Sequence, residues 1–189
     1  MTVQYREALV NEIIETQPIL RGFVRDLTTD MTAGSWDMVS YSFQRGFEAM
    51  WDLACADPSG LLNRPLLMLW RQSIELAIKS AILDIAGCID GRPGHDLDVL
   101  FNQLLSIRAG AGYLDTDDLA ENVKAMIRSA QSFDPFADRF RYPAGKSGRP
   151  DVGITIDFDE LFQAHWIIIT WCEGAAFPDH EKLPLSCER

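Results

Sequence analysis

The sequence is poor in positive charge, in histidine and in long hydrophobic runs. Its 189 residues include 17 Lys and Arg, 28 Asp and Glu and three His, which gives a formal net charge of −11. This balance disfavours non-specific binding to nucleic acid, which depends on attraction to phosphates, although it leaves room for a local basic groove. The apolar block WIIITWC is too short for a membrane span of about 20 residues. Charges near the start, such as Arg6 and Glu7, do not fit a signal peptide.

Paired cysteines and metal-binding patterns are also missing. The four cysteines form no CxxC pair and do not lie beside histidine at metal-ligand spacing. We therefore expect reduced thiols in a cytoplasmic protein, with no metal site and no cofactor. The stretch AGKSG at 144–148 ends like a phosphate-binding loop, but Phe140 occupies the position of the first glycine. Pro150 follows too soon for the helix that such a loop needs, so we predict a turn.

Hydrophobic periodicity and capping residues predict an all-α protein, an antiparallel helical bundle of about five to six helices. The predicted helices cover about 3–26, 36–54, 64–86, 95–108, 116–131 and 157–175. The expected N-caps are Ser35, Asn63, Asp115 and Asp157, and Gly87 is expected to end the third helix. Two short β-like runs predict a small hairpin-like insertion near 139–156. We expect a single domain over residues 1–177 and an irregular tail over 178–189.

The helix predicted at 64–86 is apolar on two sides. Its second, narrower stripe consists of Leu69, Leu76 and Leu83, spaced by seven residues. Such a face packs within the bundle or forms an interface with a second copy of the chain. A homodimer through these leucines is therefore the partner that the sequence suggests, alongside an unidentified protein partner.

The same helix carries a charged row in the stretch RQSIELAIK. Arg71, Glu75 and Lys79 follow at four-residue spacing, with Arg71 and Glu75 at the edge of the main apolar stripe and Lys79 further out. An exposed row of this kind stabilises a helix by only about 0.2–0.5 kcal/mol per pair. If the row is partly buried, leaving one charge unpaired costs several kcal/mol. The row is thus a solvated set of ion pairs or a polar site.

Two histidines are further candidates for this polar site. His95 and Asp96 begin a helix, where they either cap it or bring His95 to the Arg71–Glu75 row. His165 lies within the apolar stripe of the last helix. A histidine there is either a hydrogen-bonded core residue or, if it pairs with Glu75 or Arg141, an acid–base or binding group.

The segment DRFRYP is part of the one local basic cluster in the sequence. It contains Asp138, Arg139, Arg141 and Tyr142, and Lys146 and Arg149 follow it. One interpretation is a hairpin that is attached to the bundle by arginine–carboxylate pairs. The other is a contact to phosphate or RNA, with Tyr142 or Phe140 stacked on a base.

Taken in order, RQSIELAIKSAIL, GHDLDVLFNQL and FDPFADRFRYP resemble the HEPN superfamily over roughly residues 64–175. The resemblance implies an antiparallel helical bundle, often dimeric, in ribonucleases of toxin and defence systems or in non-catalytic nucleotide- or protein-binding modules. HEPN ribonucleases carry an arginine followed after four to six residues by a histidine. His95, His165 and His180 have no arginine at that distance, so ribonuclease activity does not follow from the resemblance.

Two functions remain open on the sequence. The first is a non-catalytic HEPN-like module that binds itself, a protein partner or a nucleotide-like ligand. The alternative is an RNA-processing or toxin-type nuclease whose polar site is built from Arg71, Glu75, His95 and Arg141.

Overall fold

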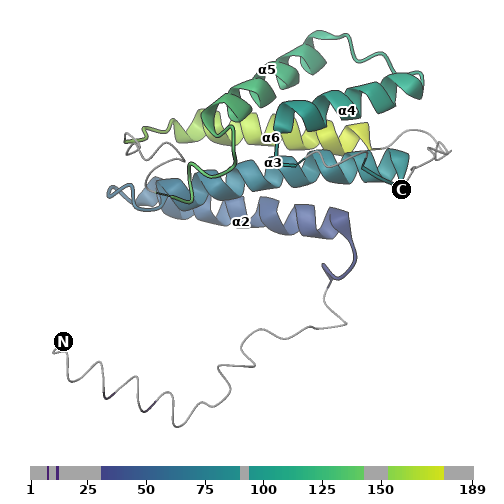
Figure 1. Cartoon of the computed structure of the whole chain (residues 1–189). Helices are drawn as coiled ribbons and strands as arrows, with labels where there is room; N and C mark the ends of the chain where they lie inside the picture. Colours follow the sequence, from purple (N-terminus) through teal and green to yellow (C-terminus); the bar gives the residue numbers. More distant parts are fainter. Residues whose placement is uncertain (1–7, 9–11, 13–30, 90–93, 143–152, 177–189) are drawn as a thin grey trace. The chain divides into compact units, whose positions relative to one another are not determined.

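Five helices make up the part of the chain that carries the candidate site. The computed structural model describes residues 8, 12, 31–89, 94–142 and 153–176, and the chain divides into two units, 1–33 and 34–189. The helices of the second unit are α2 (Trp36–Ala56), α3 (Asn63–Ala86), α4 (Leu97–Gly110), α5 (Asp118–Phe133) and α6 (Phe158–Ala175). Figure 1 shows α2 and α3 as an antiparallel pair and α4 and α5 as a second one. α3 packs against α2, α4 and α6.

The predicted all-α class is confirmed for this unit, whereas the finer predictions are not all met. Residues 139–142 form turns and 153–156 have no regular secondary structure, so the described part of the predicted hairpin at 139–156 contains no strand. The AGKSG turn and the tail at 178–189 lie outside the described residues. Of the helix predicted at 3–26, the structure describes Ala8 and Glu12, both helical. The single domain over 1–177 stays a prediction.

The hydrophobic core is centred on α3. Ile74, Ile78 and Ile82 are fully buried, and they share one core cluster with Phe101 of α4 and Ile168 of α6. Burying one such side chain contributes about 1.5–3 kcal/mol. Because other helices surround α3, its polar residues are also taken out of water.

The leucine face of α3 is largely covered within the chain. Leu76 is buried, and a methyl group placed on Gly46 of α2 would lie 3.7 Å from Leu69 Cδ2. Leu83 is half-buried. The leucine face therefore packs within the bundle, which was the first of the two interpretations. The homodimer stays a prediction.

Several helix ends follow their capping residues. Gly87 ends α3 with a φ of 75°, a conformation that favours glycine, and its amide donates to Leu83 O. The Asp157 side chain accepts from the Glu160 amide at the start of α6. Ser35 occupies the N-cap position of α2, but its hydroxyl contacts Asp37 rather than the helix amides.

Two predicted N-caps were wrong. Asp117 caps α5, whereas Asp115 pairs with Arg108 through contacts of 2.7 and 2.8 Å. Arg108 also donates to Ala175 O at the end of α6, so its planar guanidinium takes Asp115 away from the cap. At the start of α3, Leu62 is the N-cap residue and Asn63 the first residue of the helix.

Of the four cysteines expected to be reduced thiols, Cys55 and Cys172 are free in the described part of the chain, and Cys187 lies outside it. Burial raises the pKa of the Cys172 thiol to about 12. The cytoplasmic location stays a prediction. Within the described residues, we find no helix with the length and hydropathy of a membrane span.

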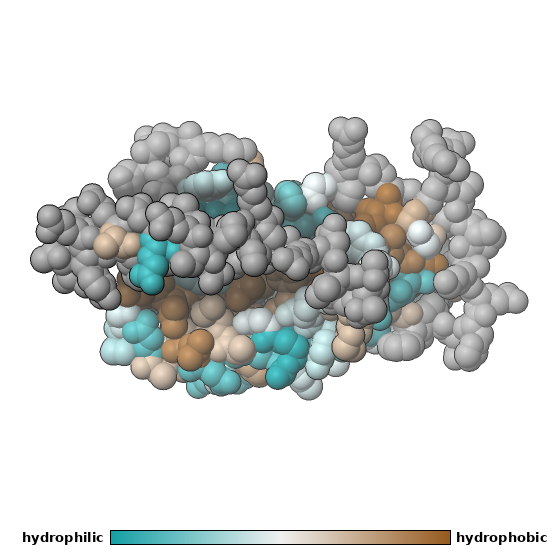
Figure 2. Space-filling view, turned by 90° about the horizontal axis from the view of Figure 1, so that it is seen from below, coloured by the Kyte–Doolittle hydropathy of each residue, from teal (hydrophilic) through white to brown (hydrophobic). Residues whose placement is uncertain are grey.

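The surface on the α2 side mixes apolar and polar residues. Figure 2 shows hydrophobic and hydrophilic side chains interspersed on the described part of this face. Trp36, Tyr41 and Leu53 of α2 are each about half exposed or more. Scattered exposed apolar side chains are normal for folded proteins and do not define a binding surface.

Candidate functional site

The charged row on α3 lies in the interior of the protein, and not at the edge of the apolar stripe as the sequence suggested. Arg71 is 2 % exposed and Glu75 is 1 % exposed, and the Lys79 side chain is 15 % exposed. The interpretation as a solvated row of ion pairs is therefore wrong. A buried charge is stable only where an opposite charge and hydrogen bonds compensate for its lost hydration, so each of these groups requires such contacts.

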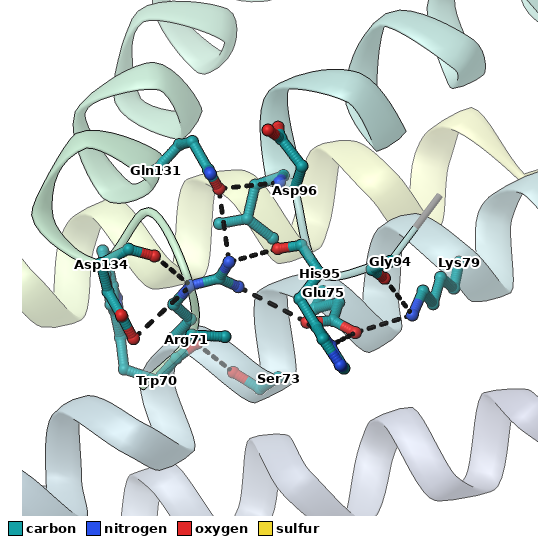
Figure 3. A network of polar contacts seen from close by, with 12 residues as sticks. Trp70, Arg71, Ser73, Glu75, Lys79, Gly94, His95, Asp96, Gln131 and Asp134 are labelled. Atoms are coloured by element: carbon teal, nitrogen blue, oxygen red, sulfur yellow. Dashed lines mark hydrogen bonds and ion pairs between the residues drawn. The ribbon is translucent and has the colours of Figure 1, made fainter. Parts of the chain in front are cut away.

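Arg71 joins three separate segments (Figure 3). Its Nη1 lies 3.5 Å from Glu75 Oε2, and its Nη2 donates to the backbone carbonyl of His95 and, at 3.3 Å, to Gln131 Oε1. Its Nε donates to Asp134 O at 3.4 Å and lies 3.9 Å from Asp134 Oδ2. Burial lowers the pKa of the guanidinium, and the carboxylates of Glu75 and Asp134 raise it. Arg71 thus connects α3 with the start of α4 and the end of α5.

Glu75 forms the second centre of the cluster. Its Oε1 accepts from Lys79 Nζ at 2.7 Å and lies 3.0 Å from His95 Nδ1. Lys79 also donates to Gly94 O at 3.1 Å. Two cations, Arg71 and Lys79, therefore balance the carboxylates of Glu75 and Asp134. We call this set of residues the Arg71 network: Arg71, Glu75, Lys79, His95, Gln131 and Asp134.

Gln131 and Asp134 are members of the network that the sequence did not indicate. Besides Arg71, Gln131 Oε1 accepts from the Leu97 amide at 2.9 Å, and Gln131 Nε2 donates to Pro135 O at 3.1 Å. Asp134 Oδ1 accepts from the amides of Asp138 and Arg139 at 2.9 and 3.0 Å. Gln131 therefore links Arg71 to the backbone of Leu97 and Pro135, and Asp134 links it to the backbone of Asp138 and Arg139.

In the described part of the chain, backbone carbonyls of the DRFRYP segment attach it to the bundle. Arg64 of α3 donates to Arg139 O at 2.8 Å and to Tyr142 O at 2.9 Å. Arg139 donates to Phe133 O at 2.9 Å, and Arg141 donates to Ala137 O. Tyr142 is exposed, with the Arg141 guanidinium 6.0 Å from its ring centroid.

Three of the predicted site residues line one pocket of about 210 Å³, which we call the Arg141 pocket. Its wall includes Arg71, His95 and Arg141, together with Gln72 and Asp134. The His95 side chain is 62 % exposed, so its imidazole faces outward while its carbonyl holds Arg71. The Arg71 network therefore holds His95 at this pocket through its carbonyl and its Nδ1, and through Asp134 it holds the backbone amides of Asp138 and Arg139, shortly before Arg141.

Asp96 and His165 have structural roles outside the pocket. Asp96 caps α4 by accepting from the Val99 amide at 3.0 Å. His165 is 4 % exposed, lies 2.6 Å from Ser73 Oγ through its Nε2, and packs on the Phe47 ring at 4.1 Å between centroids. Since Ser73 donates to Trp70 O, Nε2 is the donor to Ser73. The interpretation of His165 as a hydrogen-bonded core residue is confirmed.

Replacing Gln131 with leucine is expected to reduce the free energy of unfolding by about 1–3 kcal/mol, because the Leu97 amide and Arg71 Nη2 lose their buried acceptor. Urea unfolding measures this change. Gln103→Leu is the matched control, since Gln103 Nε2 is buried without a hydrogen-bond partner. That substitution is expected to leave stability unchanged or raised. Equal losses in both variants would contradict the role given to Gln131.

Comparison with known proteins found no relative. No protein-family model, curated protein or solved structure matches the chain. The HEPN resemblance therefore stays an expectation drawn from the residues. The function has to be argued from the site itself.

Proposed function

We propose that the chain is a non-catalytic, HEPN-like binding module that takes a small anionic ligand at the Arg141 pocket. The observation that carries this proposal is the charge of Arg141. Within the described part of the chain, no carboxylate lies at salt-bridge distance from Arg141, whereas Arg71 contacts both Glu75 and Asp134. An anion in the pocket would supply a negatively charged partner for Arg141, which otherwise donates to the Ala137 carbonyl.

The pocket's size and lining narrow the ligand further. A volume of about 210 Å³ is below the roughly 300–1,000 Å³ that is common for drug-sized ligands. We therefore propose that a phosphate or carboxylate group enters, and that a nucleotide-like ligand leaves its base outside. Arg141, His95 and Gln72 are the groups that would bind the anion, and Phe43, Met68 and Phe140 line the apolar side.

Isothermal titration calorimetry with inorganic phosphate, AMP and uncharged adenosine tests this proposal. We expect phosphate and AMP to bind and adenosine not to bind. Arg141→Ala should weaken AMP binding about tenfold or more, as the loss of a charge-assisted hydrogen bond predicts. His95→Ala retains the backbone carbonyl that holds Arg71, so it should weaken binding without unfolding the protein.

Arg128→Ala is the matched control, because Arg128 is exposed on α5 and pairs with Asp98 at 3.4 Å. This variant should bind AMP like the wild type. If neither phosphate nor AMP binds the folded protein, or if Arg128→Ala weakens binding as much as Arg141→Ala, the proposal is wrong.

A second candidate function, hydrolysis of RNA, is favoured by the contact between His95 and Glu75. Glu75 Oε1 lies 3.0 Å from His95 Nδ1, and among the described residues no group forms a hydrogen bond with His95 Nε2. An imidazole held in this way can accept a proton from an attacking hydroxyl. Incubation with a single-stranded RNA oligomer tests this function, since His95→Ala should abolish cleavage and Arg128→Ala should not.

A further inference from the structure

A second and larger cavity lies between α2, α3 and α6, away from the residues of the Arg71 network. We call it the α2–α3–α6 cavity; its volume is about 360 Å³. Small side chains form its floor: Ala77 and Ala81 from α3, and Cys172 and Ala176 from the end of α6. Because these side chains are short, the three helices leave a space of the size that small organic ligands occupy.

Two serine hydroxyls in this cavity have no hydrogen-bond partner in the described part of the chain. Ser40 of α2 is 4 % exposed and Ser80 of α3 is 8 % exposed, and both residues line the cavity. By contrast, Ser73, Ser42 and Ser132 each donate to a carbonyl of their own helix. Ser40 and Ser80 are therefore available to a bound molecule.

Among the described residues, the charged side chains that line the cavity are acidic. Asp37, Asp84 and Glu173 line it, and no lysine or arginine does so among the described residues. Glu173 Oε1 accepts from Gln44 Nε2 at 3.3 Å, which positions this carboxylate at the cavity. Hydrogen bonds from Ser35 and the Met38 amide lower the pKa of Asp37. A cleft lined by carboxylates concentrates cations from solution.

We propose that the α2–α3–α6 cavity binds a small organic cation, a protonated primary amine on a short apolar chain. The ammonium group would contact the Glu173 and Asp37 carboxylates and donate to the serine hydroxyls, while the chain lies on the alanine floor. A metal ion fits less well, because the described residues contain no group of three His, Cys, Asp or Glu arranged to hold one. The apolar floor likewise has no role in binding a bare ion.

An alkylammonium group can belong to a free amine or to a lysine side chain of another protein. Calorimetric titration with n-butylamine and with Nα-acetyl-lysine amide separates these sources. 1-Butanol is the uncharged probe of the same chain length. We expect n-butylamine to bind and 1-butanol not to bind, because the carboxylates discriminate by charge.

Glu173→Gln tests the site without disturbing the core, since Glu173 is exposed and an amide oxygen can still accept from Gln44. This variant should bind n-butylamine about tenfold more weakly, as expected for the loss of a charged acceptor. The matched control is Glu121→Gln on α5, whose side chain is 64 % exposed. It removes one carboxylate elsewhere and should bind like the wild type.

Circular dichroism first establishes that both variants are folded. The proposal is overturned if the folded wild type binds neither amine, if 1-butanol binds as tightly as n-butylamine, or if Glu121→Gln weakens binding as much as Glu173→Gln. Asp37→Asn provides a second test at the other carboxylate, and it should also weaken binding of n-butylamine.

Discussion

Replacing Arg71 with methionine is expected to reduce the free energy of unfolding by about 3–5 kcal/mol. The substitution leaves the buried Asp134 carboxylate without a cation among the described residues, and it removes one of the two cations at the buried Glu75 carboxylate. Glu75 and Asp134 are 1 % and 2 % exposed, so water cannot replace the lost guanidinium. The substitution also removes hydrogen bonds to Gln131 and to the carbonyls of His95 and Asp134. Chemical denaturation followed by circular dichroism measures this change.

Two further variants separate this effect from a general loss of surface charge. Arg45→Met removes an arginine that pairs with Glu48 at the surface, where its side chain is 63 % exposed, and it should change stability by less than about 1 kcal/mol. The double variant Arg71→Met/Asp134→Asn should recover part of the loss, because the carboxylate that has no other cation among the described residues is then neutral. A similar, small effect of Arg71→Met and Arg45→Met would contradict the buried network.

The second large effect is a loss of stability in mild acid caused by His165. Burial lowers the pKa of this imidazole from 6.5 to about 4. The unfolded chain therefore binds a proton near pH 6.5, whereas the folded protein resists protonation down to about pH 4. Stability is fully present above the unfolded pKa and falls as the pH drops between these values, by about 3 kcal/mol at 1.36 kcal/mol per pKa unit.

Denaturation measured at intervals from pH 7 to pH 4 tests this window. His165→Gln keeps a side-chain amide that can donate to Ser73 but does not titrate, so its stability should depend less steeply on pH over this range. Other groups titrate in the same way in both proteins, which makes the difference between the two curves the informative quantity. Parallel curves for the wild type and His165→Gln would show that His165 does not cause the loss.

Local features of the fold could be predicted from the sequence. Gly87 and Asp157 mark helix ends through their own backbone and side-chain preferences, and these positions are observed. Asp115 was misassigned because two acidic residues near one helix start are both suitable caps. The choice of Asp117 depends on Arg108, which engages Asp115 from the end of α4.

The candidate site could be predicted only in part, for a related reason. Arg71, Glu75 and Lys79 are recognisable as a row because four-residue spacing brings them together on one helix. Their burial was not evident, since it depends on the start of α4 and on Gln131 and Asp134 at the end of α5, which meet α3 only in the folded protein. Gln131 and Asp134 lie about 60 residues away in the chain, and on an amphipathic helix such polar residues indicate a solvated face.

The contacts of the charged row on α3 give it a structural role. Arg71 and Glu75 hold the start of α4 and the segment after α5 in place, through His95, Gln131 and Asp134. His95, which the network holds, and Arg141, which follows the held segment, are the groups that we propose meet a ligand. A ligand at the Arg141 pocket would thus bind to a preformed surface, which reduces the entropy lost on binding.

Arg71 fixes the start of α4 and the DRFRYP segment from inside the protein, through His95, Gln131 and Asp134. Amide hydrogen exchange in the wild type and in Arg71→Lys tests this role most directly, because lysine keeps the charge but cannot make the guanidinium's set of contacts. The amides of Leu97, Asp138 and Arg139 report on the network through their bonds to Gln131 and Asp134. Phe47 of α2 is the internal reference.

We predict that Arg71→Lys lowers the protection of these three amides and leaves that of Phe47 nearly unchanged. If Leu97, Asp138 and Arg139 keep their wild-type protection in the folded variant, Arg71 does not hold these segments, and the account is wrong.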